Sequence, residues 1–161
     1  MSKLGIVGVT GVVGNKFLEV IDEYNLVFDE IRLFASKKSE GKIIKFQNKD
    51  YVINSLNEGC FLDLDYVLFS AGSKVSEKWC LEAEKEGCIV IDNSSAFRFI
   101  DDFPLIVSEV NMNDFYLSKR KIIANPNCST MQCIVILDLI NKINKLKKVY
   151  YSTYQAVSGA G

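Results

Sequence analysis

Short apolar runs rich in β-branched residues alternate along the chain with longer segments whose apolar residues recur every three or four positions. The short runs predict strands at residues 6–9, 31–35, 66–69, 88–91 and 121–124. The longer segments predict helices at about 12–23 and 75–86, the second ending at Gly87. Strands that alternate with helices are typical of an α/β fold. We therefore expect a doubly wound, mostly parallel sheet that binds its ligands at the carboxyl ends of the strands.

Three further segments complete the predicted secondary structure. Residues 43–46 and 51–53 flank a polar tetrapeptide, which predicts an antiparallel hairpin or a pair of short edge strands. Residues 129–143 are so rich in apolar side chains that we expect a helix covered on most sides. Residues 150–157 predict the beginning of one more strand before the glycine-rich end.

Composition and charge narrow the class of protein. The chain has 161 residues, 48% hydrophobic and 24% charged, which fits one globular domain with a sizeable core. Its net charge of -1 supplies no basic field for nucleic acid or an anionic membrane. No apolar stretch reaches the roughly 18 residues of a spanning helix, and a strand follows Met1 almost at once, so we expect a cytoplasmic protein.

Two residue types limit the chemistry. The chain contains no histidine, which excludes a Ser-His-Asp triad, a Cys-His pair or a histidine-bound metal built from this chain alone. Its five cysteines include no C-x-x-C pair, so we expect neither a disulfide framework nor a metal site.

Glycines recur at every third position between the first strand and the first helix, at Gly8, Gly11 and Gly14. This spacing is a variant of the dinucleotide fingerprint, in which glycines let the backbone approach a pyrophosphate and the helix N-terminus supplies N–H donors. A tight strand-to-helix turn without a ligand is the alternative. The position at the head of a βαβ unit favours dinucleotide binding.

The second strand ends in Ser36, Lys37, Lys38 and Ser39, without the Asp or Glu that accepts the ribose hydroxyls in enzymes that prefer NAD. Two ammonium groups and two hydroxyls complement an additional phosphate, which favours NADP over NAD. A solvated lysine pair, partly neutralised by Glu40, is the alternative.

Cys128 lies where the apolar helix is expected to begin, because Pro126 disfavours helical backbone at Asn125. Helix N–H groups at such a position stabilise a thiolate, and they could also hold an oxyanion that develops on an attacked carbonyl. Cys128 is therefore the best candidate for a nucleophile. The remaining cysteines are interpreted as small buried hydrophobes: Cys60, Cys80, Cys88 and Cys133.

Arg98 follows a polar turn after a strand and is a candidate anion clamp, since a planar guanidinium can bind phosphate or carboxylate through two hydrogen bonds. The alternative is a surface arginine, or one paired with Asp101 or Asp102. Arg32 and Arg120 are interpreted as surface charge. Three neighbouring phenylalanines are expected in the core: Phe97, Phe99 and Phe103.

Taken together, six segments resemble the aspartate-semialdehyde dehydrogenase family, in order along the whole chain. They are residues 8–14, 35–39 with 41–42, 69–72, 92–98, 125–130 and 154–161. The resemblance implies a Rossmann-type NAD(P)-binding domain and NADPH-dependent reductive dephosphorylation of 4-aspartyl phosphate to aspartate 4-semialdehyde and phosphate. It also implies a place in lysine, threonine and methionine biosynthesis, and a homodimer or homotetramer that acts on a small molecule.

Individual roles are implied by the same resemblance. The cofactor would contact residues of the glycine loop, the second strand's end and two later turns: Gly8, Thr10, Gly11, Val12, Val13, Gly14, Ser36, Lys38, Ser39, Ala71, Gly72, Ser158 and Gly159. Cys128 would be the nucleophile, while Arg98, Asn127 and Gln155 would bind substrate. Lys38 stands where the family often has arginine, which keeps the positive charge but gives up bidentate geometry.

The sequence also departs from the family. Family members are about twice as long, and their second half supplies an acid/base histidine and further substrate-binding charges. Residues 1–127 are therefore expected to form the dinucleotide-binding domain, and residues 128–161 the nucleophile helix and the start of a truncated α+β catalytic domain. We expect little or no turnover from this chain alone, because a general acid/base typically contributes 10² to 10⁴ in rate.

Three other functions remain open at this point. N-acetyl-gamma-glutamyl-phosphate reductase shares the thioester chemistry and the cofactor fold, although residues 127–130 and the Gln155 segment favour the aspartyl enzyme. Glyceraldehyde-3-phosphate dehydrogenase is a weaker rival, because its cysteine surroundings and acidic strand end are absent. The third alternative is not an enzyme but a non-catalytic NADP-binding module.

Overall fold

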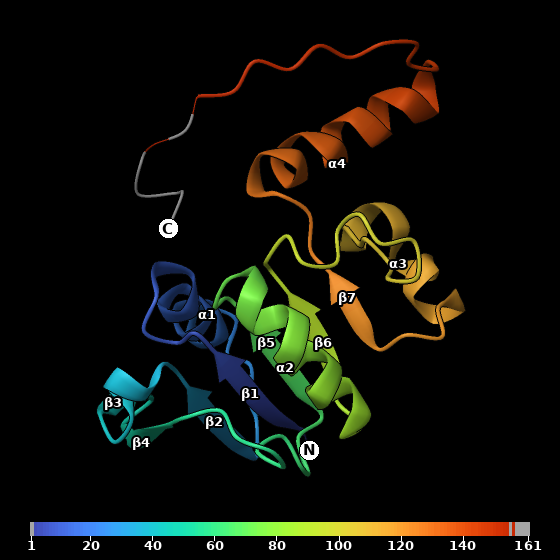
Figure 1. The fold of residues 1–161 in the computed structure, drawn as a ribbon. Helices are drawn as coiled ribbons and strands as arrows, with labels where there is room; N and C mark the ends of the chain where they lie inside the picture. Colours follow the sequence, from blue (N-terminus) through green and yellow to red (C-terminus); the bar gives the residue numbers. More distant parts are fainter. Residues whose placement is uncertain (1, 155, 157–161) are drawn as a thin grey trace.

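The computed structural model describes residues 2–154 and 156. Its elements follow one another in the order β1 (Lys3–Val7), α1 (Val12–Glu23), β2 (Glu30–Phe34), the 3₁₀ turn η1 (Lys37–Ser39), β3 (Ile43–Phe46), β4 (Lys49–Asn54), β5 (Tyr66–Phe69), α2 (Ser73–Lys85), β6 (Ile89–Asp92), α3 (Ser108–Leu117), β7 (Ile122–Ala124) and α4 (Cys128–Ile143) (Figure 1).

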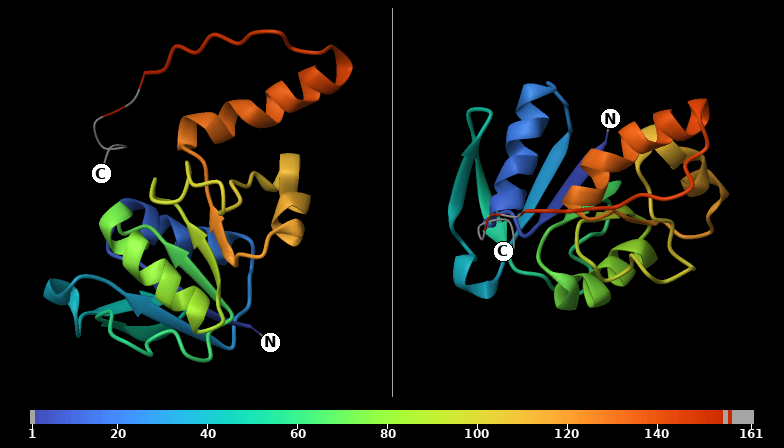
Figure 2. Two further views of the ribbon diagram at one scale, coloured as in Figure 1. Left: turned by 45° about the vertical axis from the view of Figure 1, so that its right-hand side comes forward. Right: turned by 90° about the horizontal axis from the view of Figure 1, so that it is seen from above.

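The strands form a seven-stranded sheet in the order β3-β4-β2-β1-β5-β6-β7. Every neighbouring pair is parallel except β3 and β4, which form the expected antiparallel hairpin. The connection after β1 leads to β2, whereas the connection after β5 leads to β6 on the other side. Helices α1 and α2 therefore cover opposite faces of the sheet (Figure 2). The predicted doubly wound α/β fold is confirmed.

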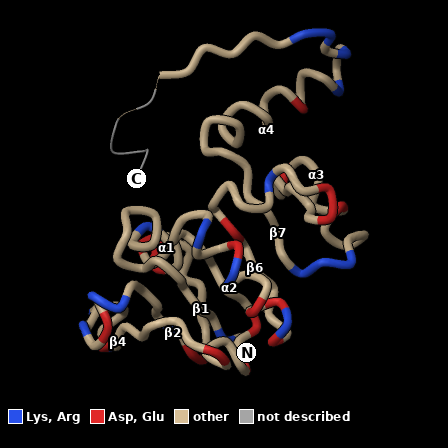
Figure 3. The backbone as a smooth tube through the Cα atoms, viewed as in Figure 1, with Lys and Arg blue, Asp and Glu red and all other residues tan. Residues whose placement is uncertain are grey.

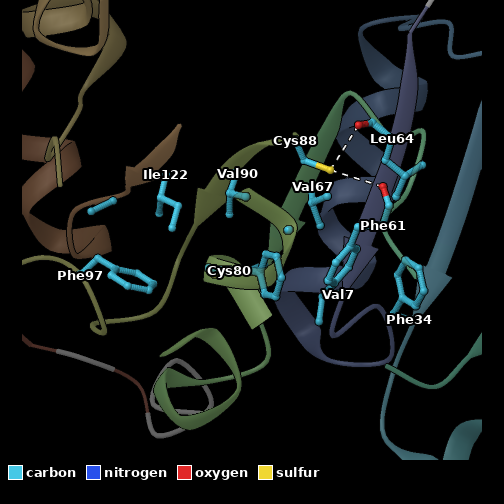
Figure 4. Close-up of a cluster of buried hydrophobic side chains, with 13 residues drawn as sticks. Val7, Phe34, Phe61, Leu64, Val67, Cys80, Cys88, Val90, Phe97 and Ile122 are labelled. Atoms are coloured by element: carbon cyan, nitrogen blue, oxygen red, sulfur yellow. Dashed lines mark hydrogen bonds between the residues drawn. The ribbon is translucent and has the colours of Figure 1, made fainter. Parts of the chain in front are cut away.

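The core has two parts because successive side chains of a strand point to opposite faces. Val7 of β1 belongs to the cluster on the α2 side, where it shares the interior with Phe61 and Cys80 (Figure 4). Leu4 and Ile6 belong to the cluster on the α1 side. Charged residues of both signs are interspersed over the sheet and its helices (Figure 3), as the small net charge suggests.

Helix α3 was not predicted. Its apolar residues do not gather on one face, and Asn111 breaks it with φ -143° and ψ 34°. The Asn111 side chain replaces the regular pattern, since its Oδ1 accepts from the Val107 N–H at 2.8 Å and its Nδ2 donates to the Leu105 carbonyl at 2.9 Å. A helix that is shaped by side-chain hydrogen bonds of this kind does not need an apolar face, so its sequence shows no 3.6-residue hydrophobic period.

The expectation that the last helix is covered on most sides is wrong for the described residues. No residue of α4 is buried, and Ile136 and Ile143 are 57% and 89% exposed. The helix projects away from the sheet (Figure 1), so its apolar character finds little to pack against in this part of the chain. Residues 150–154 and 156 also form no strand, and no described strand lies beside them to supply a ladder. Within the described residues, no helix is long and apolar enough to cross a membrane.

Candidate cofactor and nucleophile site

The loop after β1 is held tightly against the ends of its two neighbouring strands. The N–H groups of Gly8 and Val9 donate to the Phe34 carbonyl of β2, at 2.9 and 3.2 Å. Gly8 has φ +86°, and a Cβ there would lie 2.7 Å from the Ser70 carbonyl oxygen after β5. A Cβ on Gly14 would overlap the Gly8 carbonyl oxygen. Only glycine therefore lets the loop and the first turn of α1 lie this close to the sheet.

Two helices begin beside this loop without a side-chain cap. Gly11 precedes α1 and Gly72, with φ +84°, precedes α2, and neither offers a side chain to the first turn. Thr10, Val12 and Val13 are exposed around the same loop. Because the first N–H groups of a helix have no partner within the helix, they remain available to an anion such as a pyrophosphate.

A hollow of about 450 Å³ lies at this end of the sheet. Its lining comes from the turns after β1, β2 and β5 and from the start of α2: Val7, Gly8, Thr10, Gly11, Ala35, Ser36, Leu56, Ser70, Ala71, Gly72 and Val75. The connections after β1 and β5 diverge here, and such a switch point is where doubly wound sheets bind ligands. The hollow therefore brings together six of the residues predicted to bind the cofactor: Gly8, Thr10, Gly11, Ser36, Ala71 and Gly72.

Other predicted cofactor residues lie next to the hollow without lining it. Gly14 is buried under the loop, and Val13 faces a separate apolar hollow along α1. The sequence did not indicate Leu56 and Val75, which add apolar wall. Leu56 lies in an irregular segment after β4, where no periodicity marks it.

The two lysines after β2 are exposed and carry free charge. Lys37 and Lys38 lie on η1, and neither forms an ion pair with a carboxylate among the described residues. Glu40, the expected neutralising group, instead accepts a hydrogen bond from the Ser55 hydroxyl at 2.7 Å. This arrangement leaves positive charge at the edge of the hollow that Ser36 lines.

Cys128 is the first residue of α4 and is exposed. Asn127 caps the helix, since its Oδ1 accepts from the Ser129 N–H at 3.0 Å and from the Ser129 hydroxyl at 2.6 Å. The same oxygen lies 3.8 Å from the Cys128 Sγ. Asn127 was predicted to bind substrate, and the structure gives its carbonyl oxygen a structural partner, which leaves only its amide nitrogen for that role.

Cys128 lines its own hollow of about 380 Å³, between the start of α4 and the returning segment at residues 151–154. This hollow shares no lining residue with the glycine-loop hollow. The structure thus gathers the cofactor residues in one place and exposes the thiol in another. Gln155, Ser158 and Gly159 lie outside the described residues.

The other cysteines differ from Cys128 in burial. Cys80 and Cys88 are buried, and Cys60 and Cys133 are partly buried. Burial raises the pKa of Cys88 to about 11, while its thiol donates to the Phe61 and Leu64 carbonyls (Figure 4). Burial likewise raises the pKa of Cys80 and of Cys60. Among the cysteines, Cys128 alone is exposed.

Arg98 is partly buried and held by backbone carbonyls. Its Nε donates to the Asn125 carbonyl at 2.9 Å and its Nη2 donates to the Asn93 carbonyl at 2.8 Å. The alternative pairing with Asp101 or Asp102 is wrong, because Asp102 pairs with a different arginine and no described carboxylate pairs with Arg98. Its remaining guanidinium donors have no carboxylate partner among the described residues and can bind an anion. Asn125, whose carbonyl accepts from Arg98, lies three residues before Cys128.

Two other interpretations need correction. Arg120 is not simple surface charge: it is 24% exposed, pairs with Glu84 and Asp102, and lies 4.0 Å from the centre of the Phe103 ring. Phe99 is 92% exposed, so it does not belong to the core as Phe97 does. Among the described residues, no cluster of His, Cys, Asp or Glu has the arrangement of a metal site.

A doubly wound parallel sheet, with a glycine loop and uncapped helix starts at its switch point, defines a dinucleotide-binding domain of the Rossmann class. Residues 3–117 match the family model described as semialdehyde dehydrogenase, NAD binding domain. The chain belongs to the semialdehyde dehydrogenase family through this domain, and the expectation of a nicotinamide dinucleotide cofactor is confirmed.

Individual relatives agree with this assignment. The chain is 50% identical over 161 residues to aspartate-semialdehyde dehydrogenase of Aquifex aeolicus (strain VF5) and 44% identical over 158 residues to that of Bacillus subtilis (strain 168). The two matches include 99% and 98% of this chain but only 47% and 45% of the length of the two relatives. The chain thus spans about half the length of these curated relatives, and the resemblance seen in the sequence is confirmed.

A solved structure gives the same result in three dimensions. The chain superimposes with a TM-score of 0.92 and 41% identity on Vibrio cholerae aspartate semialdehyde dehydrogenase II, a structure described as complexed with ASA. The match covers 99% of this chain and 48% of that one.

Proposed function

We propose that this chain forms the cofactor domain and nucleophile segment of an aspartate-semialdehyde dehydrogenase. The reaction is the reductive dephosphorylation of 4-aspartyl phosphate to aspartate 4-semialdehyde with NADPH, a step in lysine, threonine and methionine biosynthesis. One observation carries the proposal: the exposed Cys128 thiol begins α4, and Arg98, which no described carboxylate neutralises, grips the segment leading to it.

The chemistry begins at Cys128. Its thiolate attacks the acyl carbonyl of aspartyl phosphate, a C–S bond forms, and the C–O bond to phosphate breaks to give a thioester and inorganic phosphate. Arg98 binds the departing phosphate through the guanidinium donors that it does not use on Asn93 and Asn125. N–H groups in the first turn of α4 hold the oxyanion that forms on the carbonyl.

The fit of a dinucleotide is supported by the closeness of the glycine loop, where a Cβ on Gly8 or Gly14 would meet backbone, and by the uncapped starts of α1 and α2. Thr10 and Val12 would contact the pyrophosphate, and Lys38 and Ser39 the 2′-phosphate. NADPH, when bound, supplies the hydride that reduces the thioester carbonyl. Cys128 would serve as the leaving group: its C–S bond would break, which would release the aldehyde and return the thiolate.

We also propose that the 161 residues acylate without turning over, since they contain no histidine for acid/base work. The test is mass spectrometry of the chain mixed with 4-aspartyl phosphate in the absence of NADPH. We expect one acyl adduct on Cys128 and none in Cys128→Ala, while Cys60→Ala acylates as the wild type does.

Acyl phosphates of other shape separate the rival functions. Equal adduct formation with N-acetyl-glutamyl phosphate would remove the preference for the aspartyl enzyme. An inert Cys128 in a chain that still binds NADPH would replace the enzyme by a non-catalytic binding module. Assembly into a homodimer or homotetramer is proposed on the family resemblance alone, and sedimentation of the full-length protein measures it.

A further inference from the structure

A fully buried carboxylate lies at the end of β6, outside the chemistry proposed so far. Asp92 is 0% exposed. Its oxygens accept hydrogen bonds from the Ser76 hydroxyl at 2.7 Å, the Ser94 hydroxyl at 2.6 Å and the Ser94 N–H at 3.1 Å. A carboxylate is costly to bury, and these three donors are what makes its burial tolerable.

These hydrogen bonds join three separate elements at one point. Ser76 belongs to α2, and Ser94 belongs to the turn that leads to Arg98. The Ser94 hydroxyl also accepts from the Ala96 N–H at 3.1 Å, which holds the next two residues of the turn. The Asp92 carbonyl accepts from the Asn125 N–H at 2.9 Å, just after β7. Asp92 thus fastens the turn after β6 both to α2 and to the exit of β7.

The two carbonyls that hold Arg98 are the immediate neighbours of this joint. Asn93 follows Asp92 in the chain, and Asn125 is bonded to the Asp92 backbone. The Asn125 amide also donates to the Asn93 side-chain oxygen. Since consecutive Cα atoms are about 3.8 Å apart, the Asn125 and Cys128 Cα atoms lie within about 11 Å of each other. The same joint therefore sets where the guanidinium and the thiol lie relative to one another.

We propose that Asp92 is a positioning residue, which acts through Ser94, Asn93 and Asn125 to hold the Arg98 guanidinium where it meets an anion next to Cys128. The inference rests on the proposed function, because it assigns Arg98 the anion. It adds a second requirement to that site: the geometry of the cation depends on a carboxylate that touches neither substrate nor cofactor.

Paired alkylating reagents provide the test. Iodoacetate carries a negative charge and iodoacetamide is its neutral analogue, so the ratio of their rates at Cys128 measures the positive charge beside the thiol and is insensitive to a general loss of reactivity. We expect Arg98→Met to lower this ratio by about twofold, the effect of one unit charge about 10 Å away in water.

Asp92→Asn then separates positioning from simple electrostatics. Removing a negative charge would by itself raise the preference for iodoacetate, whereas a displaced Arg98 lowers it. We expect the ratio to fall toward the Arg98→Met value. Ser94→Ala keeps the carboxylate but removes one of its donors, and we expect a fall in the same direction. Ser95→Ala is the matched control, since within the described chain the side chain of this exposed serine bonds to the Ser73 hydroxyl alone, and its ratio should equal the wild-type ratio.

The outcomes distinguish the two proposals. A ratio unchanged by Arg98→Met would remove Arg98 from the anion site and count against the proposed function. A ratio lowered by Arg98→Met but unchanged or raised by Asp92→Asn would overturn the positioning role alone. If urea unfolding shows that Asp92→Asn does not fold, Ser94→Ala decides the matter: an unchanged ratio in that variant overturns the inference.

Discussion

Single residues determine where this domain can accept negative charge. Gly8 and Gly14 admit no side chain, so backbone N–H groups remain open at the start of α1. Lys37 and Lys38 stay unpaired with any described carboxylate, because Glu40 turns to the Ser55 hydroxyl. The donors line one hollow, and the charge lies on the turn that follows Ser36, which lines the same hollow.

The first prediction concerns the charge at the end of β2. Lys38→Ala should weaken NADPH binding by about tenfold, because a hydrogen bond to a charged group is worth about 1.5 to 3 kcal/mol. NADH binding should not change, since NADH has no 2′-phosphate. Fluorescence titration of both nucleotides measures the effect, with Lys45→Ala on β3 as a control of equal charge. Equal wild-type affinity for the two nucleotides would contradict the assignment.

The second prediction concerns thiol reactivity. Cys128 should react with iodoacetamide before the other cysteines at pH 7.5, because it alone is exposed at a helix start. Burial raises the pKa of Cys60 and raises that of Cys88 to about 11, so both should label slowly near neutral pH. Peptide mapping measures the order, and Cys128→Ser should remove the fast phase while Cys60→Ser keeps it. Labelling of Cys60 first would contradict the nucleophile assignment.

Sequence reasoning succeeded for residues whose role is local and failed for those whose role depends on distant partners. The glycine spacing and the helix-start cysteine are local patterns, and the structure has the loop and the exposed thiol where they were predicted. Arg120 was misjudged because Glu84 and Asp102 lie 36 and 18 residues away in sequence. Asp92 was not singled out, since its donor Ser76 becomes a neighbour only when α2 packs on β6, and the nearby Ser94 alone does not indicate a buried carboxylate.

At the scale of elements, hydrophobic periodicity predicted the central strands and the two helices that pack on them. Those elements bury one or both faces in the core, so their pattern is set by packing. Helix α3 was missed because Asn111 hydrogen bonds shape it. Helix α4 was predicted to be covered because it is rich in apolar residues. An apolar composition shows that a helix can pack against other elements, but it does not show whether such elements lie beside it.

The third prediction concerns the ion pair that joins α2 to the exit of β6 and the start of β7. Although burial opposes it, the hydrogen bonds from Arg120 and the Lys121 N–H lower the pKa of Glu84 below 4.5. A lowered folded-state pKa means that the stability from this carboxylate is present above about pH 4.5 and is lost as the pH falls through the folded value.

Glu84→Gln should therefore lower the free energy of unfolding by about 1 to 3 kcal/mol at pH 7 and should reduce the loss of stability on acidification below pH 4.5. Urea unfolding at pH 7 and pH 4 measures both effects. Glu82→Gln, on the same helix, breaks only an exposed pair with Lys85 and should cost at most about 1 kcal/mol. Equal effects of the two variants would show that the Arg120 contact contributes nothing.

At the scale of the whole molecule, the glycine-loop hollow has a lining of described residues from several strand ends, whereas no residue of α4 is buried among the described residues. Turns after three parallel strands line the hollow, and the chain spans about half the length of its relatives. Nucleotide binding and catalytic turnover should therefore separate in this protein.

The fourth prediction follows from that separation. NADPH at 100 times its dissociation constant should stabilise the folded chain by about 2.7 kcal/mol and raise its thermal midpoint on the order of 5 to 10 °C, whether or not the chain turns over. Differential scanning calorimetry measures the shift. Lys38→Ala at the same NADPH concentration should shift less. A midpoint that does not respond to NADPH would mean that the hollow is not a nucleotide site.

The three long helices that follow parallel strands begin in two different ways. The Asn127 side chain accepts from one N–H of the first turn of α4, that of Ser129, while α1 and α2 begin after glycines without a side-chain cap. The partial positive charge at the starts of α1 and α2 is therefore available to a doubly charged ligand such as a pyrophosphate. The partial positive charge at the start of α4 already interacts with the Asn127 side-chain oxygen, next to the Cys128 sulfur. The residue before each helix, glycine or asparagine, therefore determines whether the first N–H groups stay open to an external anion or are partly satisfied by the protein itself.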